Sequence, residues 1–366
     1  MNVTYLINQQ QLEENYHSFS KFGKVYFPVK TNHNKKILKI LQKLGSGFEC
    51  DSLDHIKRIY QRKNAQNIIF SNVAKRREDV IWCINHKVNF FTVDDIETLS
   101  FIIFYAKQRK LNQLQINVRL NVFDIFKEEF TKKKVIDSRL GASVLTCKKL
   151  LNYINIQKDI QIQKGISFYV QAEVHNNDNI LVDVFQFIEK NFSEDYNLNF
   201  INIGGGSSVK RLQDSLEKIS PLMKSLNIEK IILEPGRWLV DKVEDVFIPV
   251  RRVVDTDLNE GEKLVSLDIG IYHGFNDILL HKRKFDIDIK NEEKVVLLES
   301  WNQRSKKLVL RGPTADSLDV IGIYNLPKIN IDENTIFCVK NIGAYFEVFH
   351  SDFSGKIPLE YKVNKK

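Results

Sequence analysis

The feature that most constrains the fold is a regular alternation of short apolar runs and amphipathic stretches between residues 22 and 245. The short runs fit buried strands, and the longer stretches, with apolar residues every three or four positions, fit helices. Eight such units predict a (β/α)8 barrel; an open doubly wound sheet is the rival, but it does not need eight regularly spaced units. The predicted strands are Val25–Val29, Gly47–Cys50, Ile68–Ser71, Phe90–Val93, Gln115–Leu120, Gly165–Val170, Phe200–Ile203 and Lys230–Leu233. The predicted helices include Asn34–Leu44, Ser52–Arg62, Asp95–Arg109, Thr146–Ile154, Asp178–Asn191 and Ser208–Leu226.

After about residue 245 the long helical patterns end and short β-rich runs follow. We therefore expect a barrel domain over residues 22–245 and a mainly β domain over residues 246–366. The opening residues 1–21, with a strand at Asn2–Ile7, are expected to join the β domain and make it discontinuous. The strands predicted for this domain are Val246–Val254, Lys263–Leu267, Lys294–Ser300, Lys307–Leu310 and Thr335–Val339.

Charge and cysteine content limit the classes of function. The net charge of +8 fits solvated faces, or attraction of an anionic substrate, and no aromatic-interleaved basic motif indicates a nucleic-acid partner. No apolar stretch approaches the length of about 20 residues that a spanning helix needs, and no signal peptide is evident. The four cysteines are widely spaced, which argues against zinc and disulfides and favours the cytoplasm.

Lys30 ends the apolar run Tyr26–Val29. A lysine that closes a strand is commonly just the first solvated residue. At the end of a buried strand, however, desolvation lowers the pKa of an amine and frees it to form a Schiff base. We expect the second of these roles because other motifs follow in a fixed order.

Two of these motifs end the last two predicted strands. Gly204-Gly205-Gly206 can turn sharply and direct backbone N–H groups at an anion, and late barrel loops commonly hold phosphate. Glu234-Pro235-Gly236-Arg237 offers a carboxylate that can keep a pyridinium nitrogen protonated and a guanidinium that can clamp a phosphate. Taken singly, the glycines fit a flexible loop and the tetrapeptide fits a surface Arg–Glu pair.

Two further strings, residues 311–319 (RGPTADSLD) and 341–345 (NIGAY), would be loops if they stood alone. Together, the five motifs resemble the fold-type III pyridoxal phosphate decarboxylases, the family of ornithine, arginine and diaminopimelate decarboxylases, over nearly the whole chain. This resemblance implies a barrel and a mainly β domain of the alanine racemase and decarboxylase type. It also implies that Lys30 carries pyridoxal 5′-phosphate and that Glu234 contacts the ring nitrogen.

The resemblance implies further roles. Glu49 would support the lysine, Arg119 and Asn72 would lie near the cofactor, and the Tyr345 hydroxyl would bind phosphate. The family implies a head-to-tail homodimer, in which Asp316 reaches into the partner's site as a catalytic and substrate-binding residue. The implied reaction is loss of the α-carboxylate, followed by protonation at Cα.

The first departure from the family pattern is Ala315, which stands where the decarboxylases have a cysteine that supplies the Cα proton. A methyl group has no proton to donate. Three readings stay open: another acid or a water does this work, the protein is a slower specialised decarboxylase, or it is a regulatory pseudoenzyme. The intact Lys30, Glu234 and Arg237 argue against the third.

Other departures lie near the ring and the substrate. Tyr169 stands in place of the histidine that stacks on the ring, and its aromatic face can still stack. Ala172 replaces a phosphate-binding serine, and Gln171, Ser207 or Ser208 could compensate. His281 stands where ornithine decarboxylases bind the distal amine with an acidic residue, and the chain is also shorter than typical members.

These departures predict pyridoxal chemistry on an unusual substrate, such as the 3-amino-3-carboxypropyl group of a peptidyl nucleotide in an antibiotic of the microcin C type. Asp316 and His281 are the candidate substrate-binding residues. Two alternatives remain: a racemase, for which Tyr272 is the only nominee as second base and against which Glu234 argues, and a catalytically silent binder without a cofactor.

Overall fold

The computed structural model describes residues 2–122, 125, 140–170, 179–192, 196–256, 261–291, 294–297, 299–300, 302–304 and 306–365. The chain divides into two compact units. One comprises Tyr16–Lys30 and Leu41–Trp238, and we call it the barrel unit. The other comprises Met1–Asn15, Thr31–Ile40 and Leu239–Lys366, and we call it the sheet unit.

The barrel unit is built on a closed ring of eight parallel strands, which confirms the expected (β/α)8 barrel. Each strand pairs with the next, and β9 returns to β2 through the pairs Lys24↔Ile232 and Val25↔Leu233. The carboxyl ends of parallel strands all lie at one end of such a barrel. The strands are β2 (Lys24–Pro28), β3 (Gly47–Cys50), β4 (Ile68–Phe70), β5 (Phe90–Val93), β6 (Gln113–Arg119), β7 (Gln161–Ser167), β8 (Phe200–Asn202) and β9 (Lys230–Leu233).

Aromatic rings fill part of the barrel interior. Tyr26, Phe90 and Phe200 form one buried cluster, in which neighbouring rings meet edge to face at centroid distances of 5.9 and 5.5 Å. Glycines make room for them, because a Cβ on Gly47 would lie 2.4 Å from the Tyr26 ring and one on Gly165 would lie 2.4 Å from the Phe200 ring. The result is a packed core rather than a channel.

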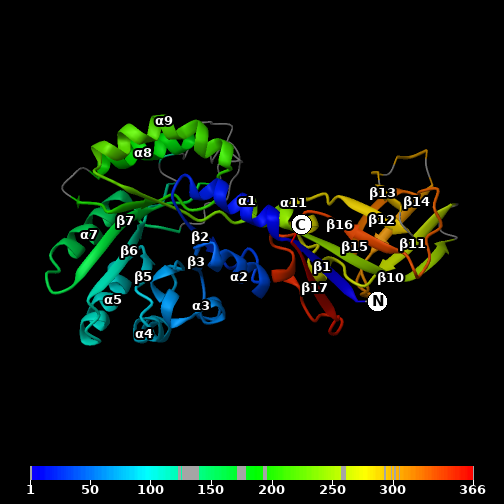
Figure 1. The fold of residues 1–366 in the computed structure, drawn as a ribbon, viewed down its shortest axis with the longest axis horizontal. Helices are drawn as coiled ribbons and strands as arrows, with labels where there is room; N and C mark the ends of the chain where they lie inside the picture. Colours follow the sequence, from blue (N-terminus) through cyan, green and yellow to red (C-terminus); the bar gives the residue numbers. More distant parts are fainter. Residues whose placement is uncertain are drawn as a thin grey trace. The chain divides into compact units, whose positions relative to one another are not determined.

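Helices between the barrel strands lie outside the ring, and α8 and α9 run side by side (Figure 1). Serine and aspartate side chains cap several of them: Ser52, Asp95, Ser143 and Ser208 each accept a hydrogen bond from a backbone N–H in the first turn. The sequence did not predict α1 or α4. The helices that begin in this unit are α3 (Leu53–Ile59), α4 (Arg77–Asn85), α5 (Ile96–Gln108), α7 (Val144–Asn155), α8 (Ile180–Asn191), α9 (Val209–Ser225) and α10 (Arg237–Val240), with a 3-10 turn at Arg62–Asn67. Two others, α1 (Gln9–Ser20) and α2 (Lys35–Lys43), have residues in both units.

The sheet unit centres on the long strand β10 (Glu244–Thr256), which pairs with β1, β11 and β16. The first strand, β1, also pairs in parallel with the last one, β17. Buried Tyr5, Phe275, Phe337 and Phe346 belong to the core of this unit. Its other elements are β1 (Val3–Asn8), β11 (Glu262–Leu267), α11 (Asp277–His281), β12 (Ile287–Asn291), β13 (Lys294–Leu297), β14 (Lys307–Arg311), β15 (Val320–Asn325), β16 (Ile336–Val339) and β17 (Leu359–Asn364), with 3-10 turns at Asp241–Val243, Ile271–His273 and Glu347–Phe349.

One predicted strand is displaced. Strand β7 spans Gln161–Ser167 rather than Gly165–Val170, because it pairs residue by residue with all of β6, from Gln113↔Gln161 to Arg119↔Ser167. Tyr169 therefore follows the strand instead of ending it. In the part of the chain that the structure describes, no helix is long and apolar enough to cross a membrane.

Candidate active site

Lys30 lies just beyond β2 and faces two carboxylates. Its Nζ is 3.5 Å from Glu49 Oε1 and 3.9 Å from Asp51 Oδ2. The lysine side chain is 46% exposed, so the expectation of a desolvated amine is wrong for the chain described here. The carboxylates of Glu49 and Asp51, rather than burial, therefore have the main influence on the Lys30 amine.

Glu49 lies on β3 and is buried, with its side chain 3% exposed. Ser71, just beyond β4, donates a short hydrogen bond from Oγ to Glu49 Oε1. A buried carboxylate needs such partners to stay ionised. Glu49 is thus a buried carboxyl group held beside the Lys30 amine.

Glu234 follows β9 and carries a perturbed carboxyl group. Burial, and then the negative charge of Glu49, raise the pKa of Glu234 to about 7, although a hydrogen bond from Asn202 opposes the shift. Asn202 Nδ2 donates to Glu234 Oε1 over 2.7 Å, and the charge of Arg119 also favours the ionised form. Near neutral pH this carboxyl group can therefore either hold or release a proton.

Two glycines of the loop after β8 have no room for a side chain. Gly204 has φ +65, and a Cβ there would lie 2.6 Å from the Phe168 carbonyl oxygen. A Cβ on Gly205 would lie 2.6 Å from the Glu234 carbonyl oxygen. Beyond the loop, the Ser207 Oγ is buried and has no hydrogen-bond partner among the described residues. The loop then runs into helix α9, which Ser208 caps.

Three more predicted residues lie at the carboxyl ends of barrel strands. Arg119 ends β6, and Arg237 opens the short helix α10 directly after buried Gly236. Tyr169 is 49% exposed two residues after β7. The predicted substitutes Gln171 and Ala172 lie outside the described residues.

The remaining predicted residues belong to the sheet unit. Asp316 Oδ1 accepts a hydrogen bond from the Leu318 backbone N–H over 2.8 Å. Tyr345 adopts φ +58, and its backbone N–H donates to the Thr31 carbonyl oxygen over 2.9 Å. His281 is exposed, with Nδ1 3.0 Å from Asp277 Oδ1.

Asn202 and Ser71, to which the sequence assigns no role, both contact carboxyl groups of the site. Asn202 joins Glu234 to the glycine loop, because its Oδ1 also accepts from the Gly204 N–H over 2.9 Å. Ser71 holds Glu49. Each stands at the end of a predicted strand, and that position was the only available signal.

Groups elsewhere offer less chemistry. The four cysteines, Cys50, Cys83, Cys147 and Cys338, are all buried, and burial raises the pKa of each thiol.

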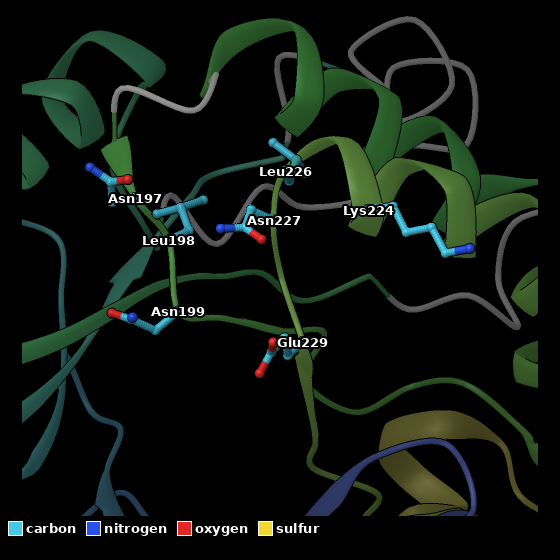
Figure 2. Close-up of a pocket in the computed structure, with 7 residues that line it drawn as sticks. All are labelled: Asn197, Leu198, Asn199, Lys224, Leu226, Asn227 and Glu229. Carbon is cyan, nitrogen blue, oxygen red and sulfur yellow. The ribbon is translucent and has the colours of Figure 1, made fainter.

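Figure 2 shows a pocket lined by Asn197, Leu198, Asn199, Lys224, Leu226, Asn227 and Glu229. These residues precede β8 and β9, so the pocket is at the end of the barrel opposite to Lys30 and Glu234, where barrel enzymes do not place their chemistry.

The residues at the carboxyl ends of the strands fit pyridoxal phosphate. Its aldehyde needs an amine, its ring nitrogen needs a proton-sharing carboxyl group, and its phosphate needs bare N–H and hydroxyl donors. Lys30 and Glu234 supply the first two. The glycine loop, in which no Cβ fits on Gly204 or Gly205, and the Ser207 hydroxyl, which has no partner among the described residues, supply the third.

Comparisons with known proteins agree with this donor set. The family model for the pyridoxal binding domain of pyridoxal-dependent decarboxylases matches residues 8–241. The chain is 26% identical to antizyme inhibitor 2 of Xenopus laevis, with 93% of this chain and 76% of that protein covered. It is 25% identical to ornithine decarboxylase of Schizosaccharomyces pombe, with 90% and 75% covered. The arginine decarboxylase of Paramecium bursaria Chlorella virus, solved with agmatine, shares the fold at a TM-score of 0.76 and 19% identity, with 100% and 97% covered.

Proposed function

The chain belongs to the pyridoxal-dependent decarboxylases, a family of carboxy-lyases, and on that premise we propose that it removes the α-carboxylate of an amino-acid group on a specialised metabolite. The observation that carries the proposal is the grouping of Lys30, Glu49 and Glu234 in the barrel unit. An amine beside a buried carboxyl group, and a second carboxyl group whose pKa is raised to about 7, are what this chemistry needs.

Bound pyridoxal phosphate supplies an aldehyde for the lysine and a ring that withdraws electrons from Cα. Lys30 presents its amine to that aldehyde, and Glu49 balances the charge of the amine. Glu234 shares its proton with the ring nitrogen, and Asn202 holds the carboxyl group in place. Gly204–Gly206, Ser207 and Arg237 bind the phosphate through backbone N–H groups, a hydroxyl and a guanidinium.

The sheet unit contributes the substrate side of the proposal. Asp316 binds the substrate from a partner subunit of a homodimer, and the Tyr345 hydroxyl adds a phosphate contact. Tyr169 stacks on the ring from the barrel side. These roles rest on the family pattern, and the side chains of Asp316 and Tyr345 are partly exposed while that of Tyr169 is exposed.

We infer that the substrate is not a small diamine precursor. His281, exposed and paired with Asp277, cannot replace a carboxylate that binds a distal ammonium group. The net charge of +8 suits an anionic substrate. A 3-amino-3-carboxypropyl group on a peptidyl nucleotide of the microcin C type meets both conditions, and its decarboxylation would place this cytoplasmic enzyme in antibiotic biosynthesis.

The test is to purify the protein, add pyridoxal phosphate and record the absorbance spectrum, then measure carbon dioxide release. The assay compares ornithine, diaminopimelate and a 3-amino-3-carboxypropyl nucleotide. We expect a visible cofactor band and release from the nucleotide alone. A protein that takes up no cofactor contradicts the enzyme assignment, whereas release from ornithine contradicts only the substrate.

The likeness to antizyme inhibitor 2, a protein named for inhibition rather than for a reaction, favours a second candidate function. In this alternative the chain is a decarboxylase-like binder that regulates another protein. The pKa of about 7 at Glu234 argues against it, because a silent binder has no need of a carboxyl group that is costly to ionise. No cofactor uptake, together with no carbon dioxide release from any amino acid, would favour the binder.

A further inference from the structure

A carboxylate–imidazole pair beside Lys30 is not used in the function proposed above. Asp51 directly follows β3, and His55 lies in the first turn of α3. Asp51 Oδ1 is 2.8 Å from His55 Nδ1, and Asp51 Oδ2 is 3.9 Å from Lys30 Nζ. One carboxylate oxygen therefore faces the imidazole and the other faces the amine.

Local structure fixes this pair in place. Ser52 caps α3 by accepting a hydrogen bond from the His55 backbone N–H over 3.2 Å. The helix therefore begins just after Asp51, and its first turn brings His55, four residues further along the chain, next to the Asp51 carboxylate. Asn72 Nδ2 donates to the Asp51 carbonyl oxygen over 3.0 Å and ties the end of β3 to the loop after β4. The pair is thus held by two neighbouring segments of the barrel unit.

The two carboxylates near the amine differ in their access to water. Glu49 is 3% exposed and accepts a hydrogen bond from Ser71, so a proton that it accepted would have no direct route to solvent. Asp51 is 33% exposed and His55 is 21% exposed. The imidazole of His55, 2.8 Å away, and then the charge of Lys30, hold the pKa of Asp51 below its usual range, although partial burial opposes the shift. Asp51 therefore releases protons readily.

We propose that Asp51 carries protons between the Lys30 amine and water, and that His55 is a positioning residue that keeps Asp51 ionised and turned toward the amine. One proton passes from the Nζ ammonium to Asp51 Oδ2, which leaves a neutral amine and a carboxylic acid. The acid then gives this proton to water and becomes a carboxylate again. At 3.9 Å the gap exceeds a hydrogen bond, and rotation of the exposed lysine side chain or one bridging water closes it.

This inference rests on the proposed function in one respect, because the amine must lose a proton before it can bond to the cofactor aldehyde. Other charged groups also act on Lys30. Glu49 lies 3.5 Å from its Nζ, and the charges of Lys30 and Glu234 influence each other. Buried Cys50 responds to Lys30, Glu49 and Asp51, but burial is the main reason why its pKa is raised. The test must therefore isolate Asp51 and His55 by substitution.

The first measurement is acylation of Lys30 in the full-length, cofactor-free chain at a series of pH values, read by mass spectrometry. Asp51→Asn removes a charge that favours the ammonium form, so the midpoint of labelling should fall by about 0.3 to 0.7 pH unit. Asp54→Asn is the matched control, because Asp54 is an exposed carboxylate in the first turn of α3, three residues beyond Asp51. If the midpoint of labelling is the same in Asp51→Asn and Asp54→Asn, the proposed interaction between Asp51 and Lys30 is overturned.

The second measurement is the rate at which added pyridoxal phosphate bonds to Lys30, followed by absorbance across pH. Asp51→Asn should slow this step by at least about 10-fold, and Asp51→Glu should restore part of the rate. His55→Gln should shift the pH profile of the rate, whereas His86→Gln, in α4's C-terminal cap, should not. An unchanged profile in His55→Gln overturns the positioning role.

The two measurements separate the two proposals. Acylation needs no cofactor, so it decides the Asp51 contact even if the chain never binds pyridoxal phosphate. Absence of the cofactor band in the wild-type protein contradicts the proposed function instead. Thermal unfolding of every variant shows whether a change in rate reflects a damaged fold.

Discussion

The carboxyl ends of the barrel strands and the 312–319 loop of the sheet unit differ in what their polar groups do. At the barrel end, Lys30 is exposed, the Ser207 hydroxyl has no described partner, and Glu234 titrates near neutral pH. In the loop, the buried carboxylate of Asp319 accepts hydrogen bonds from Ile271 N–H, Thr314 N–H and Thr314 Oγ1. The first region has polar groups ready for a ligand, whereas the second uses its best-bonded carboxylate to hold its own shape.

This difference separates a region that can bind a ligand from one that is held by its own contacts. Gly312 shows how tightly the loop is built, because a Cβ there would lie 2.4 Å from the Asp319 carboxylate oxygens. The loop is thus tightly packed, while exposed Ala315 within it carries no acid. We infer that the cofactor chemistry is retained and that substrate recognition and proton donation have diverged.

The largest expected effect comes from Lys30→Ala, which tests whether the barrel end is the reactive region. Loss of the amine should abolish the visible cofactor band and lower carbon dioxide release by at least about 10³-fold, because no covalent attachment remains. Absorbance and gas release measure both. Lys36→Ala, at an exposed lysine of α2, is the control. If Lys30→Ala keeps the band, the barrel end is not where the cofactor is attached.

The next effect concerns stability. The folded state raises the pKa of Glu234 from 4.5 to about 7, so between these values it binds more protons than the unfolded state. Stability of the cofactor-free protein should therefore fall as pH rises through this window, by up to about 3 kcal/mol. Glu234→Gln should remove this loss and be more stable than the wild type above pH 7.

Chemical denaturation from pH 5 to 8 measures this difference. Glu229→Gln, at an exposed carboxylate just before β9, is the matched control and should follow the wild type. The same Glu234→Gln variant should lose catalysis, so stability and function change in opposite directions. If the free energy of unfolding changed with pH in the same way in Glu234→Gln and in the wild type, the raised pKa of Glu234 would be contradicted.

A third, smaller effect is expected in the glycine loop. In Gly204→Ala a methyl group meets the Phe168 carbonyl oxygen at 2.6 Å in a left-handed backbone. Overpacking of this kind costs about 1–3 kcal/mol, which corresponds to a loss of about 5- to 150-fold in pyridoxal phosphate affinity. Gly45→Ala is the control, because Gly45 also has positive φ, at +90, but its nearest neighbour, the Tyr16 hydroxyl, is 3.8 Å away. Equal affinities for pyridoxal phosphate in the two variants would contradict the proposal that the glycine loop binds the phosphate.

Much of the barrel could be predicted from the sequence because its strands are short apolar runs with clear ends. Gly47–Cys50, Phe90–Val93 and Lys230–Leu233 have the predicted bounds. The sheet unit was harder, since β17 (Leu359–Asn364) alternates only between partly buried and exposed positions and is defined by its pairing with β1 near the N-terminus. Such pairing depends on distant residues that local patterns do not reveal.

The candidate site shows the same limit. Motifs at strand ends predicted Lys30 and Glu234 as neighbours of a cofactor, because the barrel brings strand ends together. The exposure of Lys30 was predicted wrongly, since it depends on which side chains surround the amine rather than on its place after an apolar run. The contacts of Asn202 and Ser71 join different strands, and the sequence alone could not pair them.

The smallest expected effect is that of Ala315→Cys, and it sharpens the comparison from the side of the loop. If the chain has moved proton donation to another group, a restored thiol has nothing to add, and the ratio of amine to aldehyde product should change by less than about 2-fold, within the usual effect of a surface substitution. Product analysis by mass spectrometry measures this ratio, with Ala315→Ser as the control of similar size. A large shift toward the amine in Ala315→Cys alone would mean that the wild-type enzyme protonates Cα poorly, and the divergence of the loop would then be a loss rather than a replacement.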